Sequence, residues 1–342
     1  MFTIRRAVRA AALAVGVASL VLGGLGASPA QAVHDETYTM AIIGDVPYGN
    51  ALITHFPAFI SQINADPDVR LVTHLGDIKN GSTVCSDDYY DLIASDFALF
   101  RDPLVYTPGD NEWTDCHRLN NGAYNPLERL AKIRSLFFAS PGRTLGQQQV
   151  AVKSQATAGY PENVGYTRNG ISFAALNIPG SNNSMLPWTG LGYTAPTPEQ
   201  VQEVTARTAA DIALVDDTVA KANADGSRAV VLQTQADMFD PTVGTPSWSD
   251  YGAFKPIVQA IVHASSRFDG PVYLFNGDSH IYNVDAPLAA GSSWLPFYGV
   301  TGTADNLTRI TVNGSSLGES DWLEVTTHSV GAPLTWQLIP AS

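Results

Sequence analysis

The stretch Tyr38-Thr-Met-Ala-Ile-Ile-Gly-Asp45 is a short apolar run that ends in a glycine followed by an acid. The same ending follows other short apolar runs later in the chain, at Arg70–Asp77, Leu104–Asp110 and Pro271–Asp278. Apolar runs of this length, bounded by turn residues, are typical of buried strands. We therefore predict a buried strand before each of these Gly-Asp pairs.

Helical patterns lie between and after these strands. In residues 51–64 the apolar side chains recur at the spacing of one helix face. Similar patterns occupy 87–99, 126–138 and 251–265. The longest predicted helix runs from Thr197 to about Asn223, because Thr197 suits the N-cap and Pro198 the first turn. Strands alternating with helices in this way indicate an α/β fold with βαβ units.

Antiparallel strands are expected in addition to this α/β core. Residues 165–178 read as a hairpin whose turn is Asn169-Gly170. Further strands are predicted at 228–234, 308–312, 322–327 and 334–338. No internal repeat or linker divides the sequence. We therefore expect one domain over residues 33–342 that includes C-terminal β-strands.

The first 32 residues have the order of a secretory signal peptide. Three arginines (Arg5, Arg6 and Arg9) precede an apolar run that extends to about Gly26, and small residues surround Ala32. We expect cleavage after Ala32 and secretion into the extracellular or cell-wall space, by the Sec or the twin-arginine route. A retained membrane anchor is the alternative.

The remaining residues are strongly acidic. The whole chain has a net charge of −13, and removing the three positive charges of segment 1–32 leaves −16. An acidic surface repels phosphate backbones, so we expect no nucleic-acid surface. No second long apolar run follows, so we expect no membrane contact after signal cleavage. The oligomeric state stays open.

Cys85 and Cys116 are the only cysteines in the sequence. In an oxidising compartment such a pair favours a disulfide over free thiols. The bond would tie together the loops that follow Asp77 and Asp110. Two cysteines are too few for a zinc-thiolate site.

The four strand-end acids, Asp45, Asp77, Asp110 and Asp278, carry the strongest functional indication. In open α/β sheets, ligands bind at the carboxyl ends of the strands. A preceding glycine lets the chain turn sharply toward the cleft. Gly and Asp are also common turn formers, so a turn without function is the alternative. The recurrence of the pattern favours a shared metal-binding cleft.

The blocks at these strand ends resemble one known family. They are Gly44-Asp45, Gly76-Asp77, Gly109-Asp110-Asn111-Glu112 and Gly277-Asp278-Ser279-His280. In order and spacing they are similar to the calcineurin-like metallophosphoesterase superfamily over about residues 38–285. The resemblance implies a sandwich of two mixed β-sheets flanked by helices. It also implies two metal ions and hydrolysis of phosphate esters by a metal-bound water.

The resemblance assigns a role to each ligand. Asp77 corresponds to the aspartate that bridges the metals. Asp45 and His280 would hold one metal, and Asp110 and Asp278 the other.

The chain departs from the family pattern where the family has histidines. Pro47, Asn111 and Asp278 occupy the positions of three of these histidines. Gln235 or Asp237 occupies the position of a fourth. The ligand set is therefore nearly all oxygen, which suits Mg²⁺, Mn²⁺ or Ca²⁺ better than zinc and leaves iron open. Loss of the histidine at position 111 would weaken assistance to the leaving group, a contribution of about 10²–10⁴-fold.

Other residues beside the cleft are candidates for catalysis or substrate contact. Asn111 and Glu112 would surround the metals or touch substrate, and with His280 they form the predicted catalytic set. The predicted substrate contacts are Tyr48, Lys79, His117, Arg118 and Asn182. Salt bridging is the alternative for Lys79 and Arg118, and a plain surface position for His117. We expect His74 to be structural.

The sequence therefore predicts a secreted, metal-dependent phosphoesterase-like hydrolase that acts on a small phosphate ester. A different class remains open, namely an exported protein that keeps the fold and binds a cation or another ligand without catalysis. A purely structural protein without metal is a third hypothesis.

Overall fold

The computed structural model describes residues 35–315 and 321–341. The predicted signal peptide, 1–32, lies outside the described residues. The described part belongs to one compact unit that begins at Asp35. Within it, no helix has the length and apolar character needed to span a membrane.

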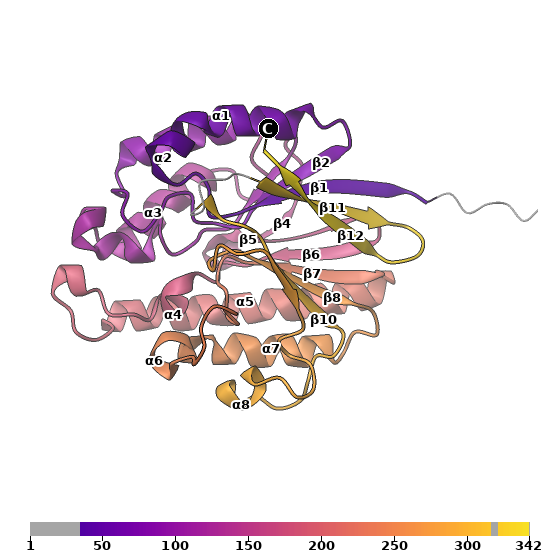
Figure 1. The fold of residues 1–342 in the computed structure, drawn as a ribbon. Helices are drawn as coiled ribbons and strands as arrows, with labels where there is room; N and C mark the ends of the chain where they lie inside the picture. The colour runs from indigo at the N-terminus through magenta and orange to yellow at the C-terminus, as the bar shows by residue number, and fades with distance from the viewer. Residues whose placement is uncertain (1–34, 316–320, 342) are drawn as a thin grey trace, which may run out of the picture. The chain divides into compact units, whose positions relative to one another are not determined.

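Two β-sheets form the centre of this unit (Figure 1). The first has the order β12-β11-β1-β2-β3 and the second the order β4-β5-β6-β7-β8-β10-β9. The strands of the first sheet are β1 (Thr37–Ile43), β2 (Val69–His74), β3 (Leu104–Tyr106), β11 (Asp321–His328) and β12 (Leu334–Pro340). Those of the second are β4 (Lys153–Gln155), β5 (Tyr160–Arg168), β6 (Ile171–Ala175), β7 (Ala229–Gln233), β8 (Val272–Asn276), β9 (Asn283–Asp285) and β10 (Leu307–Thr311).

Both sheets are mixed. Strands β1, β2 and β3 are parallel, whereas β11 pairs antiparallel with both β1 and β12. In the second sheet β6, β7, β8 and β10 are parallel, and β4, β5 and β9 add antiparallel edges. The carboxyl ends of the parallel strands therefore carry the loops in which the four aspartates lie.

Helices cover the outer faces of the two sheets (Figure 1). On the first sheet lie α1 (Gly49–Ala65), α2 (Asp87–Phe97) and α3 (Pro126–Phe137), and on the second lie α5 (Pro198–Asp225) and α7 (Lys255–Ser265). The shorter helices are α4 (Gly180–Ser184), α6 (Trp248–Tyr251) and α8 (Trp294–Tyr298). Single 3-10 turns are η1 (Thr114–His117), η2 (Leu119–Asn121), η3 (Ala156–Ala158), η4 (Thr189–Leu191) and η5 (Gly252–Phe254).

Strand β1 shows how the layers are joined. Ala41 and Ile43 pack with the helices on one side, and Met40 and Ile42 pack between the sheets on the other. Both faces are apolar because successive side chains of a strand point in opposite directions. Full burial of a side chain such as Ile42 contributes about 1.5–3 kcal/mol, and this fixes the strand's register.

The predicted architecture of two mixed sheets flanked by helices is confirmed. The strands before the four Gly-Asp pairs are present as β1, β2, β3 and β8, and β5 pairs with β6 as the predicted hairpin. Thr197 caps α5 in a capping box with Gln200. The predicted helix at 251–265 is different, because α6 and the turn η5 precede a helix that begins at Lys255.

Candidate metal centre

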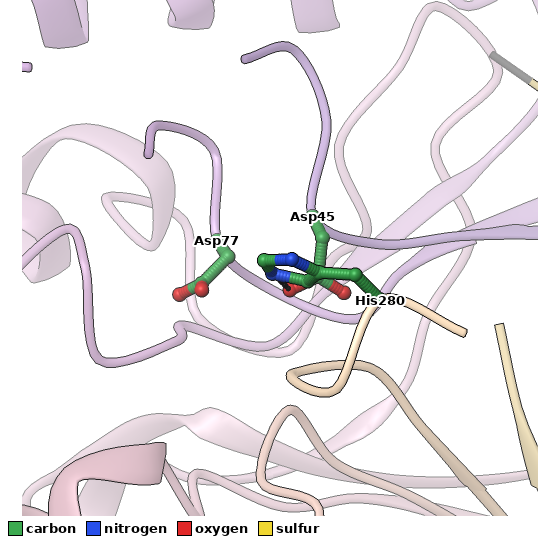
Figure 2. A group of neighbouring side chains, drawn as sticks. All are labelled: Asp45, Asp77 and His280. Carbon is green, nitrogen blue, oxygen red and sulfur yellow. Dashed lines mark ion pairs between the residues drawn. The ribbon is translucent and has the colours of Figure 1, made fainter. Parts of the chain in front are cut away.

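Two groups of side chains at the strand ends have ligand atoms within 4.8 Å of one another. The first contains Asp45, Asp77 and His280, which Figure 2 shows close together. The second contains Asp77, Asp110 and Asp278. Asp77 therefore belongs to both groups, so that one carboxylate stands between two sets of potential ligands.

The backbone is strained at most of these positions. Asp45, Asp77, Asp278 and His280 have φ values of 53°, 57°, 74° and 60°. Left-handed conformations of non-glycine residues cost about 1–3 kcal/mol each and concentrate at functional sites. The sharp turn thus lies at the acid itself. Of the four preceding glycines, Gly76 alone has a positive φ, 89°.

Glycine is required before Asp110 and before Asp278 because another ligand packs against each of these glycines. A Cβ at Gly109 would lie 2.1 Å from Asp77 Oδ1, and a Cβ at Gly277 would lie 2.2 Å from Asp45 Oδ2. Each glycine gives room to the carboxylate that arrives from another strand. The Gly-Asp pattern therefore reflects close packing of the ligand loops.

Tyr48 and Asn111 orient the shared carboxylate of Asp77. Asp77 Oδ2 accepts hydrogen bonds from the Tyr48 hydroxyl at 2.9 Å and the Asn111 side-chain amide at 2.5 Å. Asp77 Oδ1 accepts from the Asn111 backbone N–H at 3.1 Å. Burial, followed by the charges of Asp77 and Asp45, raises the pKa of Tyr48 well above its ordinary value. The tyrosine therefore remains a donor to Asp77.

Asp110 is held by donors from the second half of the chain. Gln235 donates from Nε2 to Asp110 Oδ1 at 3.1 Å, and the Ser181 hydroxyl donates to Asp110 Oδ2 at 2.9 Å. The Gln235 carbonyl oxygen accepts from the Gly180 N–H at 2.6 Å. Gln235 is thus at the site, but the amide nitrogen faces Asp110. This orientation corrects the prediction that Gln235 is a metal ligand.

The acids of the first and last blocks are in direct contact. The Asp278 N–H lies 3.1 Å from both carboxylate oxygens of Asp45, and His280 Nε2 lies 3.1 Å from Asp45 Oδ1. Asp278 Oδ2 accepts from the Asp237 backbone N–H at 3.1 Å. The loop after β8 is therefore docked against the loop after β1.

Asp237 does not face the ligand groups, which corrects its predicted role as a ligand. Its carboxylate forms a buried ion pair with Arg309 and accepts from the Ser279 hydroxyl at 2.8 Å. Burial raises the pKa of Asp237 to about 6, although the Arg309 charge opposes the rise. Asp237 acts on the site through its backbone, which holds Asp278.

Glu112 lies behind the ligands, where it accepts hydrogen bonds from the loops that carry them. Its Oε1 accepts from the N–H groups of Asp77 at 3.1 Å and Gly109 at 2.6 Å, and from the Tyr106 hydroxyl at 2.9 Å. The side chain is fully buried. Of its two predicted positions, surrounding the ligands or touching substrate, the geometry fits the first.

The predicted substrate contacts Lys79, Arg118 and His117 have partners elsewhere. Lys79 is fully buried and donates to the Asn111 carbonyl at 2.7 Å, and burial lowers its pKa to about 8. Arg118 pairs with Asp115 at 2.6 Å. His117 is buried and accepts from the Gly190 N–H at 3.3 Å. The expected surface position of His117 is therefore wrong, and His117 belongs to neither of the two ligand groups.

The loop connections around the site include one covalent bond. Cys85 and Cys116 form a disulfide, as the sequence suggested. Their sequence separation is 31 residues, and the bond joins the segment after Asp77 to η1 after Asp110. The two loops that follow Asp77 and Asp110 are therefore linked covalently.

Electrostatics favours a cation at these groups. The pKa of Asp77 is raised well above its ordinary value, first by burial and then by the charges of Asp110, Glu112, Asp45 and Asp278. Burial and the charges of Asp110 and Asp45 act on Asp278 in the same direction. Buried like charges need a counter-charge or protons. The oxygen-rich donor set fits a hard divalent cation.

A cavity of about 330 Å³ borders the second group. Asp278 and Ser181 form part of its wall, as does the predicted substrate residue Asn182. The Asn182 side chain donates to the Ser249 carbonyl at 2.8 Å and accepts from the Ala253 N–H at 2.8 Å. Asn182 thus joins α4 to the segment that closes the other side of the cavity. Ser181, the neighbour of Asn182 in the same wall, also contacts Asp110 directly.

No protein-family model matches this chain, and no curated protein matches it. Similar solved structures include one titled "GAP50 the anchor in the inner membrane complex of Plasmodium", with 9% identity, coverage of 89% of this chain and 84% of that chain, and a TM-score of 0.48. Another is a Vps29 single mutant from Entamoeba histolytica, with 10% identity, coverage of 89% and 99%, and a TM-score of 0.30. At these values the likeness assigns no activity to this chain.

Proposed function

We propose that this chain is a divalent-metal-dependent hydrolase of phosphate esters. The observation that carries the proposal is the pair of overlapping ligand groups that share Asp77. The strained backbone at Asp45, Asp77, Asp278 and His280 supports it, because strain of this kind is retained where function needs it. The order of the Gly-Asp blocks adds the resemblance to calcineurin-like metallophosphoesterases.

The chain's own residues have defined tasks in this proposal. Asp45 and His280 would hold one metal and Asp110 and Asp278 the other, with Asp77 available to both groups. Tyr48 and Asn111 keep the Asp77 carboxylate in place, and Glu112 fixes the loops behind it. Bound divalent metals supply Lewis acidity and a reactive water at neutral pH. Mg²⁺, Mn²⁺ and Ca²⁺ are favoured over zinc because all ligands except His280 are oxygen donors.

We also propose that the protein acts outside the cell. The residue order of segment 1–32 is that of a secretory signal, and the Cys85–Cys116 disulfide suits an oxidising compartment. The net negative charge of the chain disfavours polyanionic partners such as nucleic acids.

The test combines metal titration with turnover. Purified protein is titrated calorimetrically with Mg²⁺, Mn²⁺, Ca²⁺ and Zn²⁺, and hydrolysis of a phosphomonoester and a phosphodiester is followed with each metal. Asp77→Asn should abolish turnover and weaken binding in both groups. Asp68→Asn is the matched control, because Asp68 is an exposed acid before β2, at the opposite end of that strand. Equal turnover by the two variants would refute the proposal.

A non-catalytic cation-binding protein is the second candidate. The observation that favours it is the single imidazole, His280, in the two ligand groups of the described chain. His117, the nearest replacement that the sequence offered, is turned to Gly190 instead. Metal binding that depends on Asp77, without hydrolysis of either ester type, would select this candidate.

A further inference from the structure

The cavity beside the candidate metal centre has an acidic wall. Asp237, Asp250 and Asp278 line it, and among the described lining residues there is no lysine, arginine or histidine. Pockets that receive an anionic group usually offer such cations. The charges of this wall repel a second anion and attract a cation.

Metal at Asp278 would not remove this negative character. Asp237 is paired with Arg309, but Arg309 also pairs with Asp285, so no positive charge is left over for the cavity. Asp250 is exposed and has no ion pair in the described part of the chain. Asp250 and the Asp237–Arg309–Asp285 group therefore each contribute one net negative charge beside the cavity, in addition to the charges that a metal would neutralise.

Aromatic side chains form another part of the wall. Tyr251 and Phe254 both line the cavity, and their ring centroids are 6.3 Å apart. The face of an aromatic ring attracts organic cations, at about 0.5–2 kcal/mol per contact. Carboxylates together with aromatic rings are a combination suited to an ammonium group.

The cavity and the metal groups share a border at Asp278. A phosphoryl group at the metals would therefore have the cavity next to it. A volume of about 330 Å³ admits a small organic group.

We infer that this cavity receives the positively charged alcohol part of a small phosphate ester, such as the phosphate of an amino alcohol. The inference rests on the proposed function, since it places the phosphoryl group at the metal groups. Hydrolysis of such an ester breaks the bond between phosphorus and the alcohol oxygen. The oxygen of water joins phosphorus, and a proton goes to the departing alcohol.

The test compares three phosphates of similar size that differ in charge. Phosphocholine carries a cation, propyl phosphate carries no further charge, and 2-phosphoglycolate carries an additional anion. Binding to the protein saturated with Mg²⁺ is measured by calorimetry, and turnover is measured separately. We expect affinity to fall in that order, with phosphocholine about tenfold tighter than 2-phosphoglycolate, equivalent to about 1.4 kcal/mol.

Variants connect the preference to the cavity wall. Asp250→Asn should bring the ratio of the two affinities toward one, and Tyr251→Leu should weaken phosphocholine binding more than propyl phosphate binding. Asp68→Asn makes the same change in net charge and should keep the ratio of the unmodified protein.

The outcomes separate this inference from the proposed function. If esters are hydrolysed but the three phosphates bind equally or in the reverse order, the inference is wrong and the proposed hydrolase function stands. An unchanged affinity ratio in Asp250→Asn has the same meaning. If binding is charge-selective but no ester is hydrolysed, the proposed hydrolase function is wrong and the inferred preference of the cavity for a cation stands. Failure of all three phosphates to bind at millimolar concentration overturns the inference as well.

Discussion

The imidazole of His74 donates a hydrogen bond from Nε2 to the backbone carbonyl of Val46, at 2.8 Å. Its Nδ1 accepts from the Gly76 N–H at 3.2 Å, so the ring is the neutral tautomer with its proton on Nε2. The ring thus connects the loop that follows Asp45 to the loop that contains Asp77. A fully buried histidine inside β2 holds the two ligand loops at their observed separation.

This arrangement predicts a specific pH dependence of stability. Burial lowers the pKa of His74 from 6.5 to about 4. Between these values the unfolded chain binds a proton at this residue and the folded chain does not, so the free energy of unfolding falls as the pH falls. At about 1.36 kcal/mol per pH unit, the loss by pH 4 is about 3 kcal/mol. Denaturant unfolding at pH 7, 5.5 and 4 measures it.

His74→Phe isolates this contribution. Buried carboxyls with raised pKa, such as Asp237, change stability with pH in the opposite direction, so the comparison uses the difference between the two proteins. The variant should be less stable at pH 7, where the hydrogen bonds are lost, and the difference should shrink by pH 4. A difference that stays constant over this range would contradict the assigned protonation state.

Replacement of Asp77 by Asn should stabilise the protein in chelator and destabilise it, relative to the unmodified protein, when metal is present. In chelator at pH 7, Asp77→Asn removes one of several buried negative charges and should raise the free energy of unfolding by about 0.5–2 kcal/mol. Because the pKa of Asp77 is raised, this advantage should fade toward pH 4, where the unfolded carboxyl is protonated too. With Mg²⁺ or Mn²⁺ present, the unmodified protein should become the more stable one. Thermal unfolding in both buffers checks the reversal.

Gly277→Ala tests the packing of the ligand loops without changing charge. The new Cβ would lie 2.2 Å from Asp45 Oδ2, so the carboxylate or the loop must move. We expect a loss of stability of about 1–3 kcal/mol and weaker metal binding. Gly244→Ala is the control, because no atom lies within 4 Å of the position of its Cβ. Equal metal affinities of the two variants, measured by calorimetry, would contradict the close packing.

Removal of the disulfide should cost stability and loosen the metal centre. The bond closes a segment with a sequence separation of 31 residues, and such a cross-link contributes about 3–4 kcal/mol in the chain-entropy model. The double variant Cys85→Ala/Cys116→Ala should lose this amount in denaturant unfolding and bind metal less tightly. The reduced unmodified protein is the matched control, and a reduced form as stable as the oxidised one would disprove the expected effect.

Helices and strands that are determined by neighbouring residues in the chain were predictable from the sequence. The strand before Asp45 follows from an apolar run that ends at turn residues, and the start of α5 follows from Thr197 and Pro198. Both depend on residues that are neighbours in the chain. Short edge strands such as β4 and β9 were not predicted, because three residues carry too little pattern.

The roles of individual side chains depended on partners far away in the sequence. Gln235 turns its carbonyl toward Gly180, and Asp237 pairs with Arg309. Neither partner is identifiable from spacing alone, so both residues looked like ligands. Lys79 was misassigned for the same reason, since its acceptor is the backbone carbonyl of Asn111. Charge and loop position predicted which residues lie near the site but not the direction in which they point.

The pairing of β1 with β11 has a consequence for how the protein folds. Thr37 faces His328 in the register of these strands, so the strand that leads to Asp45 gains its second neighbour from the far end of the described chain. Contacts between such distant segments form slowly because the chain must first close a long loop. Ser315 then donates to the Asp45 carbonyl at 2.7 Å, so the first ligand loop is completed by equally distant residues. Metal capture would therefore be a late step of folding, and the appearance of metal affinity during refolding would report that both ends of the chain have come together.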